Sequence, residues 1–336
     1  MINGHGDDAF RYAHIRANFS SNVYHRVNHD GLNRYLAERL SCIRSYPEPE
    51  PYTLGAELAR LYGVRPEEVC VTNGATEAIY LIAQAFRGSR SQVWIPTFSE
   101  YADACRLHAH RVEGISSVEA LTEEEGICWL CNPNNPTGQT WEADTLRRLI
   151  MQYPRTLFVI DQSYALFTEK EVLPVDETVA CPNVLLLHSM TKCFAVPGLR
   201  LGAVTGNEAL LQRIRGCRMP WSVNALAVEA GQYLLRHLEE YRMEVPALLA
   251  ERKRVAEALE ATGGVEVFPS DTHYFLARLR KGSAPDLKAY LAERHGLLIR
   301  DASNFEGLDT RYFRIAIQTE EENNLLIEGI REWIRG

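Results

Sequence analysis

A single lysine stands among phosphate-binding residue types in the run Ser189-Met-Thr-Lys192-Cys-Phe-Ala-Val-Pro-Gly198-Leu-Arg200-Leu-Gly202. The amine of Lys192 can form a Schiff base with an aldehyde, and Ser189 and Arg200 can hold a dianionic phosphate beside it. Gly198 and Gly202 allow another stretch of backbone to approach closely. The pattern indicates a site for an aldehyde cofactor that carries a phosphate. The alternative is an exposed basic turn between a strand and the next element.

An acid and a phenol follow an apolar run in the sequence Val159-Ile-Asp161-Gln-Ser-Tyr164, upstream of the lysine. A carboxylate here can pair with a pyridine nitrogen and keep it protonated, so that the ring accepts the electrons left when a bond to a substrate's Cα breaks. Tyr164 would donate to the phenolic oxygen of the ring. A helix cap or a surface acid is the alternative for Asp161, and its spacing to Lys192 favours the pyridine role.

Two turns supply further contacts to such a cofactor. In Cys131-Asn-Pro-Asn-Asn135-Pro-Thr-Gly138, two prolines and a glycine fix an irregular turn that holds Asn135 where its amide can hydrogen-bond the ring oxygen. The alternative is an ordinary turn between two elements, in which Asn135 has no ligand. The run Val71-Thr-Asn73-Gly74-Ala75-Thr76 leads from a strand into a helix, whose free N–H groups at its start would bind the phosphate.

Over nearly its whole length the chain resembles pyridoxal-phosphate enzymes of the aspartate-aminotransferase fold type, in the branch of histidinol-phosphate aminotransferase and threonine-phosphate decarboxylase. The resemblance implies an α/β fold of type I, with a mainly parallel sheet flanked by helices in a large domain and a smaller α+β C-terminal domain. It also implies pyridoxal 5'-phosphate as the cofactor. In this reading Lys192 forms the Schiff base, Asp161 is the pyridine partner, and Tyr164 and Asn135 contact the ring oxygen. The implied phosphate site consists of Gly74, Ala75, Thr76, Ser189 and Arg200.

The same resemblance assigns further residues. Phe98 in Pro96-Thr-Phe98-Ser-Glu-Tyr101 matches the aromatic side chain that stacks on the ring, without the hydroxyl that many relatives have. Tyr46 matches a tyrosine that reaches the phosphate in the neighbouring subunit, which implies a homodimer with shared active sites. Arg314 and Arg300 match arginines that bind the acidic groups of the substrate, because a guanidinium fork suits carboxylate and phosphate. For Arg300 an ordinary strand-end arginine is the alternative.

The cofactor motifs do not distinguish transamination from decarboxylation, because the choice between these reactions depends on how the substrate is oriented. The amino-terminal segment resembles threonine-phosphate decarboxylases in its opening Gly4-His5-Gly6 and in Phe19-Ser-Ser-Asn22, although Val23-Tyr-His-Arg replaces the usual Asn-Pro-Leu-Gly. This favours His5 and Asn22 as substrate ligands, with an exposed histidine as the alternative for His5. The implied reaction converts L-threonine O-3-phosphate to (R)-1-aminopropan-2-yl phosphate in cobalamin biosynthesis. The alternative is a histidinol-phosphate aminotransferase of histidine biosynthesis.

Composition excludes several other classes of protein. The net charge of −8 disfavours nucleic acid as a partner, and no residues are spare for the DNA-binding module of a regulator. Eight scattered cysteines and an opening without a secretory signal favour a cytoplasmic protein with reduced thiols. Cys128 and Cys131 form a C-x-x-C pair, but in a strand they point to opposite faces, so no metal site is expected. No apolar run is long enough to cross a bilayer.

The order of apolar segments predicts the domain layout. Apolar runs at 93–95, 127–131, 157–160 and 184–188 alternate with amphipathic stretches, which is typical of a mainly parallel sheet with helices on both faces. We expect an N-terminal arm at 1–30, a large cofactor-binding domain at 31–224 and a small domain at 225–336. A long helical segment from Ala225 to Leu259, broken at Pro246, should join the two domains.

Overall fold

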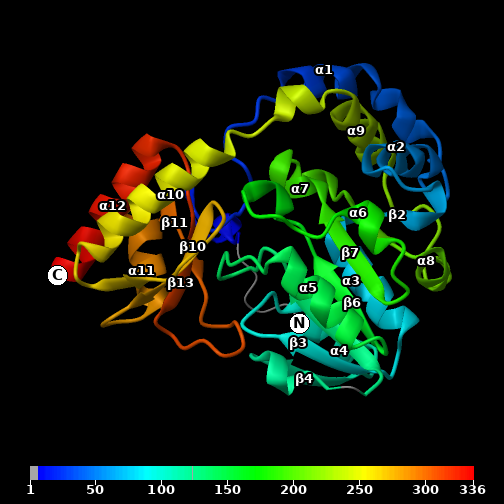
Figure 1. Ribbon diagram of the computed structural model, residues 1–336. Coiled ribbons are helices and arrows are strands. Elements are labelled where there is room, and N and C mark those ends of the chain that lie inside the picture. The colour runs from blue at the N-terminus through cyan, green and yellow to red at the C-terminus, as the bar shows by residue number, and fades with distance from the viewer. Residues whose placement is uncertain (1–6, 123) are drawn as a thin grey trace.

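A mainly parallel sheet forms the centre of the larger domain in the computed structural model, which describes residues 7–122 and 124–336 (Figure 1). Within the described residues, seven strands lie in the order β2-β8-β7-β6-β5-β3-β4. Only β8 runs against its neighbours, β7 and β2. The strands are β2 (Val69–Thr72), β3 (Arg90–Trp94), β4 (Arg111–Ile115), β5 (Gly126–Cys131), β6 (Thr156–Asp161), β7 (Val184–Ser189) and β8 (Gly202–Gly206). The predicted sheet is confirmed.

Both faces of this sheet are covered, which explains the nearly continuous apolar runs of its inner strands. On β5, Ile127 and Trp129 belong to one core cluster, while Cys128 and Leu130 belong to a second cluster on the other face. Helix α3 (Gly74–Ala85) contributes to the first cluster and α5 (Ala143–Gln152) to the second. The other helices of this domain are α1 (Asp30–Glu38), α2 (Tyr52–Tyr62), α4 (Glu100–Leu107), α6 (Val175–Thr178), α7 (Met190–Cys193), α8 (Glu208–Arg215) and α9 (Ala225–Arg236).

A separate antiparallel sheet forms the smaller domain, drawn in orange and red in Figure 1. Its strands lie in the order β12-β13-β10-β9, and helices α10 and α12 pack against each other beside it. The elements are β9 (Val265–Val267), β10 (Tyr274–Leu279), β12 (Arg300–Asp301), β13 (Tyr312–Ala316), α10 (Val245–Glu260), α11 (Ala284–Tyr290) and α12 (Glu320–Arg335). A capping box of Thr319 and Glu322 satisfies free N–H groups at the start of α12.

The connection between the domains differs from the expected long helical segment, and its first helix, α9, packs against α1 and α2 of the large domain. Helix α9 ends at Arg236, a short 3-10 helix spans Leu238–Tyr241, and α10 begins at Val245. Pro246 therefore lies in the first turn of α10, where its missing N–H interrupts no helical hydrogen bond. The prediction of a break at Pro246 was wrong in position, because the proline starts a helix there and the break precedes it. In the described part of the chain, no helix is long and apolar enough to cross a membrane.

The amino-terminal segment connects the small domain to the short helix α7 that carries the lysine. Strand β1 (Ala17–Asn18) pairs in parallel with β11 (Leu297–Leu298) of the small domain. Asp8 and Lys288 form an ion pair at 2.7 Å, and both side chains are largely buried. Farther along, the Tyr24 N–H donates to the Lys192 carbonyl at 2.9 Å. The segment thus brings its own residues to the edge of the central sheet.

Strand β8 begins in close contact with the start of helix α3. A Cβ atom added at Gly202 would lie 2.6 Å from the Ala75 nitrogen and 2.8 Å from the His188 carbonyl oxygen. At Gly198, by contrast, an added Cβ would meet no atom of the described residues within 4 Å. The predicted close approach of backbone is confirmed at Gly202 and wrong at Gly198, because the 3-10 helix Pro197–Leu199 leaves Gly198 on the surface.

These two glycines provide a matched test of that contact. The Gly202→Ala change should lower the free energy of unfolding by about 1–3 kcal/mol, because backbone atoms must move to admit the methyl group. The Gly198→Ala change should leave it within about 0.5 kcal/mol of the parent value. Denaturant titrations followed by circular dichroism measure both, and equal effects of the two changes would contradict the close approach.

Candidate active site

A cavity of about 250 Å³ opens at the carboxyl edge of the central sheet. Strands β3, β5, β6 and β7 all end at this edge, since parallel strands bring their carboxyl ends together. Most residues predicted for the site line the cavity: Asn22, Ala75, Thr76, Phe98, Asn135, Asp161, Tyr164, Ser189, Lys192, Arg200, Arg300 and Arg314. The structure therefore brings together side chains from both domains and from the amino-terminal segment.

One end of the cavity has the character of an anion site. Ala75 and Thr76 lie in the first turn of α3, where free backbone N–H groups and the helix dipole favour negative charge. Gly74 has a φ of 78°, and a Cβ there would lie 2.6 Å from Arg200 Nη2, so a guanidinium packs against this helix start. Ser189 adds a hydroxyl from the end of β7. These donors suit a phosphate group.

Lys192 lies on the short helix α7, directly after β7. The Ser189 side chain caps this helix by accepting from the Thr191 N–H at 3.4 Å. Burial together with the nearby cations Arg314 and Arg200 lowers the pKa of Lys192 to about 8, against the opposing attraction of Asp161. A larger fraction of its amine is therefore neutral near neutral pH than for an exposed lysine, and a neutral amine is the nucleophile that an aldehyde requires.

Asp161 is the last residue of β6, and only 5% of its surface is exposed. Its Oδ2 accepts a hydrogen bond from the Tyr101 hydroxyl at 2.7 Å, and its Oδ1 accepts one from the Ser163 N–H at 2.8 Å. Donors to both oxygens stabilise the ionised carboxylate in this buried position. Asp161 can therefore face a cationic group in the cavity, as its predicted role requires.

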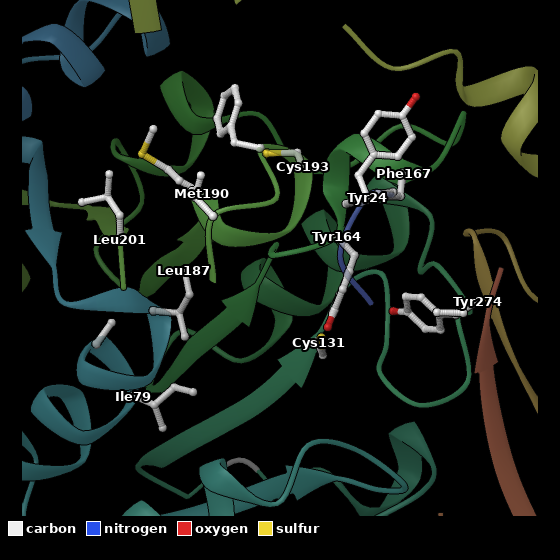
Figure 2. Close-up of a cluster of buried hydrophobic side chains, with 14 of the residues drawn as sticks. Tyr24, Ile79, Cys131, Tyr164, Phe167, Leu187, Met190, Cys193, Leu201 and Tyr274 are labelled. Carbon is white, nitrogen blue, oxygen red and sulfur yellow. The ribbon is translucent and has the colours of Figure 1, made fainter. Parts of the chain in front are cut away.

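Tyr164 lies one turn beyond Asp161, and its hydroxyl accepts a hydrogen bond from Asn22 Nδ2 at 3.2 Å. Burial raises the pKa of Tyr164, so it stays protonated and keeps a proton to donate. Figure 2 shows Tyr164 and Tyr274 turned toward each other, Tyr164 from the large domain and Tyr274 from β10, with ring centroids 5.0 Å apart. Tyr274 in turn donates to the Asn134 carbonyl at 3.0 Å, which connects β10 to the turn around Asn135.

Two arginines from the small domain supply positive charge to the cavity. Arg300 and Arg314 are direct neighbours across the β12–β13 pair, and both are buried. Arg314 donates through Nη1 to Asn135 Oδ1 and through Nη2 to the Ser20 carbonyl at 2.5 Å. Burial lowers the pKa of Arg300 to about 10, with Arg314 as a second cause, so Arg300 remains a cation at neutral pH.

Two buried polar atoms of the cavity residues have no hydrogen-bond partner among the described residues. They are Arg314 Nε and Asn22 Oδ1. Buried polar atoms are almost always satisfied in folded proteins, so such atoms beside a cavity mark positions where a polar ligand binds. One is a cationic donor and the other a neutral acceptor, which suits a ligand with an acidic group and a donor group.

Three predicted residues stand apart from this lining. His5 lies outside the described residues. Gly74 contacts Arg200 rather than the cavity itself. Tyr46 is 83% exposed and packs on Trp221, with ring centroids 5.1 Å apart. Its predicted contact would be with a partner subunit, and that role stays a prediction.

Sequence reasoning also missed residues that line the cavity. Among them are Asp7 of the amino-terminal segment, Phe305 beside Arg300, and Tyr101. A signal existed for Tyr101, because it belongs to the same Pro96–Tyr101 run as Phe98 and lies in the first turn of the helix that follows. The loop residue Phe305 and the terminal Asp7 follow no periodic pattern, so their approach to the cavity depends on the tertiary fold.

The combined donor set fits pyridoxal 5'-phosphate. The helix start with Arg200 and Ser189 suits its phosphate, Lys192 its aldehyde and Asp161 its pyridine nitrogen. Phe98 offers an aromatic face, and Asn135 and Tyr164 offer polar groups for the ring oxygen. Residues at or beyond the ends of β2, β3, β5, β6 and β7 thus converge on one ligand of known shape.

Comparison with known proteins agrees with this site. The model of the family described as aminotransferase class I and II matches residues 18–330. Threonine-phosphate decarboxylase from Salmonella typhimurium is 31% identical over 334 residues, with 95% of this chain and 91% of the relative covered. Histidinol-phosphate aminotransferase from Desulfitobacterium hafniense is 31% identical over 325 residues, with 91% and 88% covered.

A solved structure extends the comparison to three dimensions. The crystal structure of L-threonine-O-3-phosphate decarboxylase from Porphyromonas gingivalis superimposes with a TM-score of 0.93 at 40% identity and covers 95% of this chain and 100% of its own. The fold is therefore that of the aspartate-aminotransferase type. The chain belongs to the aminotransferase class I and II family and is an enzyme that depends on pyridoxal 5'-phosphate.

Proposed function

We propose that this enzyme decarboxylates L-threonine O-3-phosphate to (R)-1-aminopropan-2-yl phosphate, a step of cobalamin biosynthesis. The observation that carries the proposal is the pair of buried guanidiniums, Arg300 and Arg314, at one cavity. The substrate has two acidic groups, a carboxylate and a phosphate, and each suits one planar guanidinium. The 40% identity to a decarboxylase of this substrate supports the same reading.

In this proposal, each side chain of the cofactor region has one task. When bound, pyridoxal 5'-phosphate supplies an electron sink for the electrons left at Cα when a substrate bond breaks. Lys192 would hold the aldehyde and would hold or release a proton at Nζ. Asp161 holds a proton at the ring nitrogen through its ionised carboxylate, and Tyr164 donates from its hydroxyl to the ring oxygen. Phe98 covers one ring face and excludes water from it.

The substrate residues select the bond that breaks. Arg314 is held by Asn135 and by the Ser20 carbonyl, so its guanidinium has a fixed direction and its Nε remains for the ligand. Arg300 binds the second acidic group, and Asn22 adds a polar contact from the amino-terminal segment. His5 is proposed as a further ligand of the substrate phosphate. An acid group fixed at one end of the substrate would set which Cα bond is presented for cleavage.

The alternative is a histidinol-phosphate aminotransferase, supported by a relative that is 31% identical, the same value as for the decarboxylase of Salmonella typhimurium. Histidinol phosphate carries a phosphate but no carboxylate, so it would engage one of the two guanidiniums. The second would then serve 2-oxoglutarate in the other half of the reaction. The two candidates therefore differ in which acidic groups the same arginines meet.

An assay with both candidate substrates separates them. The purified enzyme loaded with cofactor should release carbon dioxide from L-threonine O-3-phosphate without consuming 2-oxoglutarate. With histidinol phosphate it should show at most about one hundredth of that rate, because this compound offers only one acidic group to the two guanidiniums. Turnover of histidinol phosphate that requires 2-oxoglutarate would overturn the proposal in favour of the alternative.

A matched pair of variants tests the arginine. Arg314→Lys should reduce kcat/KM for threonine phosphate by about 10- to 100-fold, since an ammonium loses the bidentate geometry. Arg311→Lys is the control, because Arg311 adjoins the same strand but pairs with Asp309 on the surface. Its kcat/KM should equal that of the parent enzyme. Equal losses in both variants would show that strand β13, and not the guanidinium, is what the change affects.

The lysine assignment has a covalent test. Borohydride should fix the cofactor to Lys192 in the parent enzyme and leave none attached in Lys192→Ala, as read by mass spectrometry of the tryptic peptide. The rate at which the cofactor-free enzyme takes up pyridoxal 5'-phosphate should rise with pH across about 8, because its lowered pKa makes the amine neutral above that value. Cofactor fixed to another lysine in the variant would refute the assignment.

The enzyme is further proposed to be a homodimer with shared sites. Tyr46 and Trp221 form an exposed aromatic patch, and Ile43 and Met219, which shortly precede them in the sequence, are 62% and 74% exposed. The Trp221 N–H donates to the Pro49 carbonyl at 2.9 Å, which holds the two halves of the patch together. An apolar patch of large side chains is typical of a surface that a protein partner covers.

Subunit exchange tests shared sites. Tyr46→Arg and Lys192→Ala should each be inactive alone. In a mixed dimer, both lesions meet in one site and the other site has neither, so random exchange should restore about a quarter of the parent activity. Native mass spectrometry measures the exchange. Full exchange without recovered activity would show that each site is built from one chain.

A further inference from the structure

We infer that Tyr101 is a positioning residue, which fixes the Asp161 carboxylate toward the cofactor and stabilises its ionised form. The inference rests on the proposed role of Asp161 and adds the group that enforces it. Tyr101 lies in the first turn of α4, and its hydroxyl donates to Asp161 Oδ2 at 2.7 Å. Only 1% of the Tyr101 side chain is exposed, so no water competes for this contact.

The geometry leaves the tyrosine one role in the pair. Burial and the nearby Asp161 raise the pKa of Tyr101 well above its ordinary value, so its hydroxyl keeps its proton and acts as the donor. Asp161 Oδ1 already accepts from the Ser163 N–H at 2.8 Å. Each carboxylate oxygen thus has one donor, and an ionised carboxylate retains further lone pairs for a ring nitrogen.

Packing holds the tyrosine in this position. Its ring stacks on Trp129 of β5, with centroids 5.9 Å apart and an interplanar angle of 21°. On the other side, it meets the edge of Phe98 at 5.8 Å. A hydrogen bond from Trp129 Nε1 to Ser91 Oγ at 3.3 Å in turn fixes the position of the Trp129 ring. Tyr101 therefore contacts both Asp161, which is expected at the ring nitrogen, and Phe98, which is expected on the ring face.

The chemical consequence concerns one proton. A carboxylate and a pyridine nitrogen compete for the proton between them, and a donor on the carboxylate weakens its hold on that proton. With the Tyr101 hydroxyl present, the proton stays on the ring nitrogen, where the electron sink needs it. Without the hydroxyl, the proton moves toward Asp161 and the ring becomes a weaker acceptor of electrons.

The experiment reads this proton directly. The enzyme is loaded with pyridoxal 5'-phosphate labelled with ¹⁵N in its ring, and the nitrogen resonance reports protonation. In Tyr101→Phe the resonance should move toward that of an unprotonated pyridine, and turnover should fall by about 10- to 100-fold with KM within about threefold. Tyr101→His keeps an aromatic ring with an N–H donor, and its resonance should lie nearer to that of the parent enzyme.

Tyr80→Phe is the matched control. The Tyr80 hydroxyl donates to Glu100 Oε2 at 2.7 Å, and Glu100 directly precedes Tyr101 in the chain. The change therefore removes a tyrosine–carboxylate hydrogen bond of the same kind and leaves the bond to Asp161 in place. The ring resonance should not move in this control. The inference would be overturned if the resonance did not move in Tyr101→Phe. It would also be overturned if the resonance moved equally in Tyr101→Phe and Tyr80→Phe, or equally in Tyr101→Phe and Tyr101→His. An unprotonated ring in the parent enzyme would instead refute the role proposed for Asp161.

Discussion

The site depends on the burial of opposite charges within one small volume. Asp161 is a buried carboxylate, and Lys192, Arg300 and Arg314 contribute positive charge around the same cavity. Charges removed from water are costly unless they are paired and hydrogen-bonded. The structure meets this condition for Asp161 with two donors, and for Arg314 with two acceptors. The balance stays positive, which suits a cofactor and a substrate that both carry phosphate.

The parallel sheet is what makes this density of charge possible. The inner strands β5, β6 and β7 are largely apolar on both faces and carry polar residues at or just after their carboxyl ends. Because β5, β6 and β7 point the same way, their polar ends meet at one edge. The reversed strand β8 adds its first residue to this edge, and Gly202 lets it approach the start of α3.

Local sequence patterns were sufficient to predict the central sheet and most of the candidate residues that line the cavity. The residues around Lys192, Asp161, Asn135 and Thr76 each follow a strand, so their place at the carboxyl edge follows from the strand pattern alone. The break in the inter-domain helix was misplaced because proline has opposite effects within a helix and in its first turn.

Contacts between distant segments escaped sequence reasoning for a different reason. Asp7 and Phe305 reach the cavity only through the docking of the amino-terminal segment and of a loop in the small domain. Neither stands in a periodic segment or a recognisable turn. The link between Tyr101 and Asp161 joins residues 60 positions apart, and no short-range pattern encodes such a distance.

The amino-terminal segment also has a mechanical consequence. It is fixed to the small domain by the pairing of β1 with β11 and by the Asp8–Lys288 ion pair. It is fixed to helix α7 by the hydrogen bond from the Tyr24 backbone N–H to the Lys192 carbonyl. Between these anchors lie only a few residues, among them Ser20 and Asn22, which contact Arg314 and Tyr164. A segment with so few residues between its anchors cannot extend much. A rotation of the small domain would therefore pull on the backbone of Lys192, so that closure around a substrate and the position of the reactive amine become one motion.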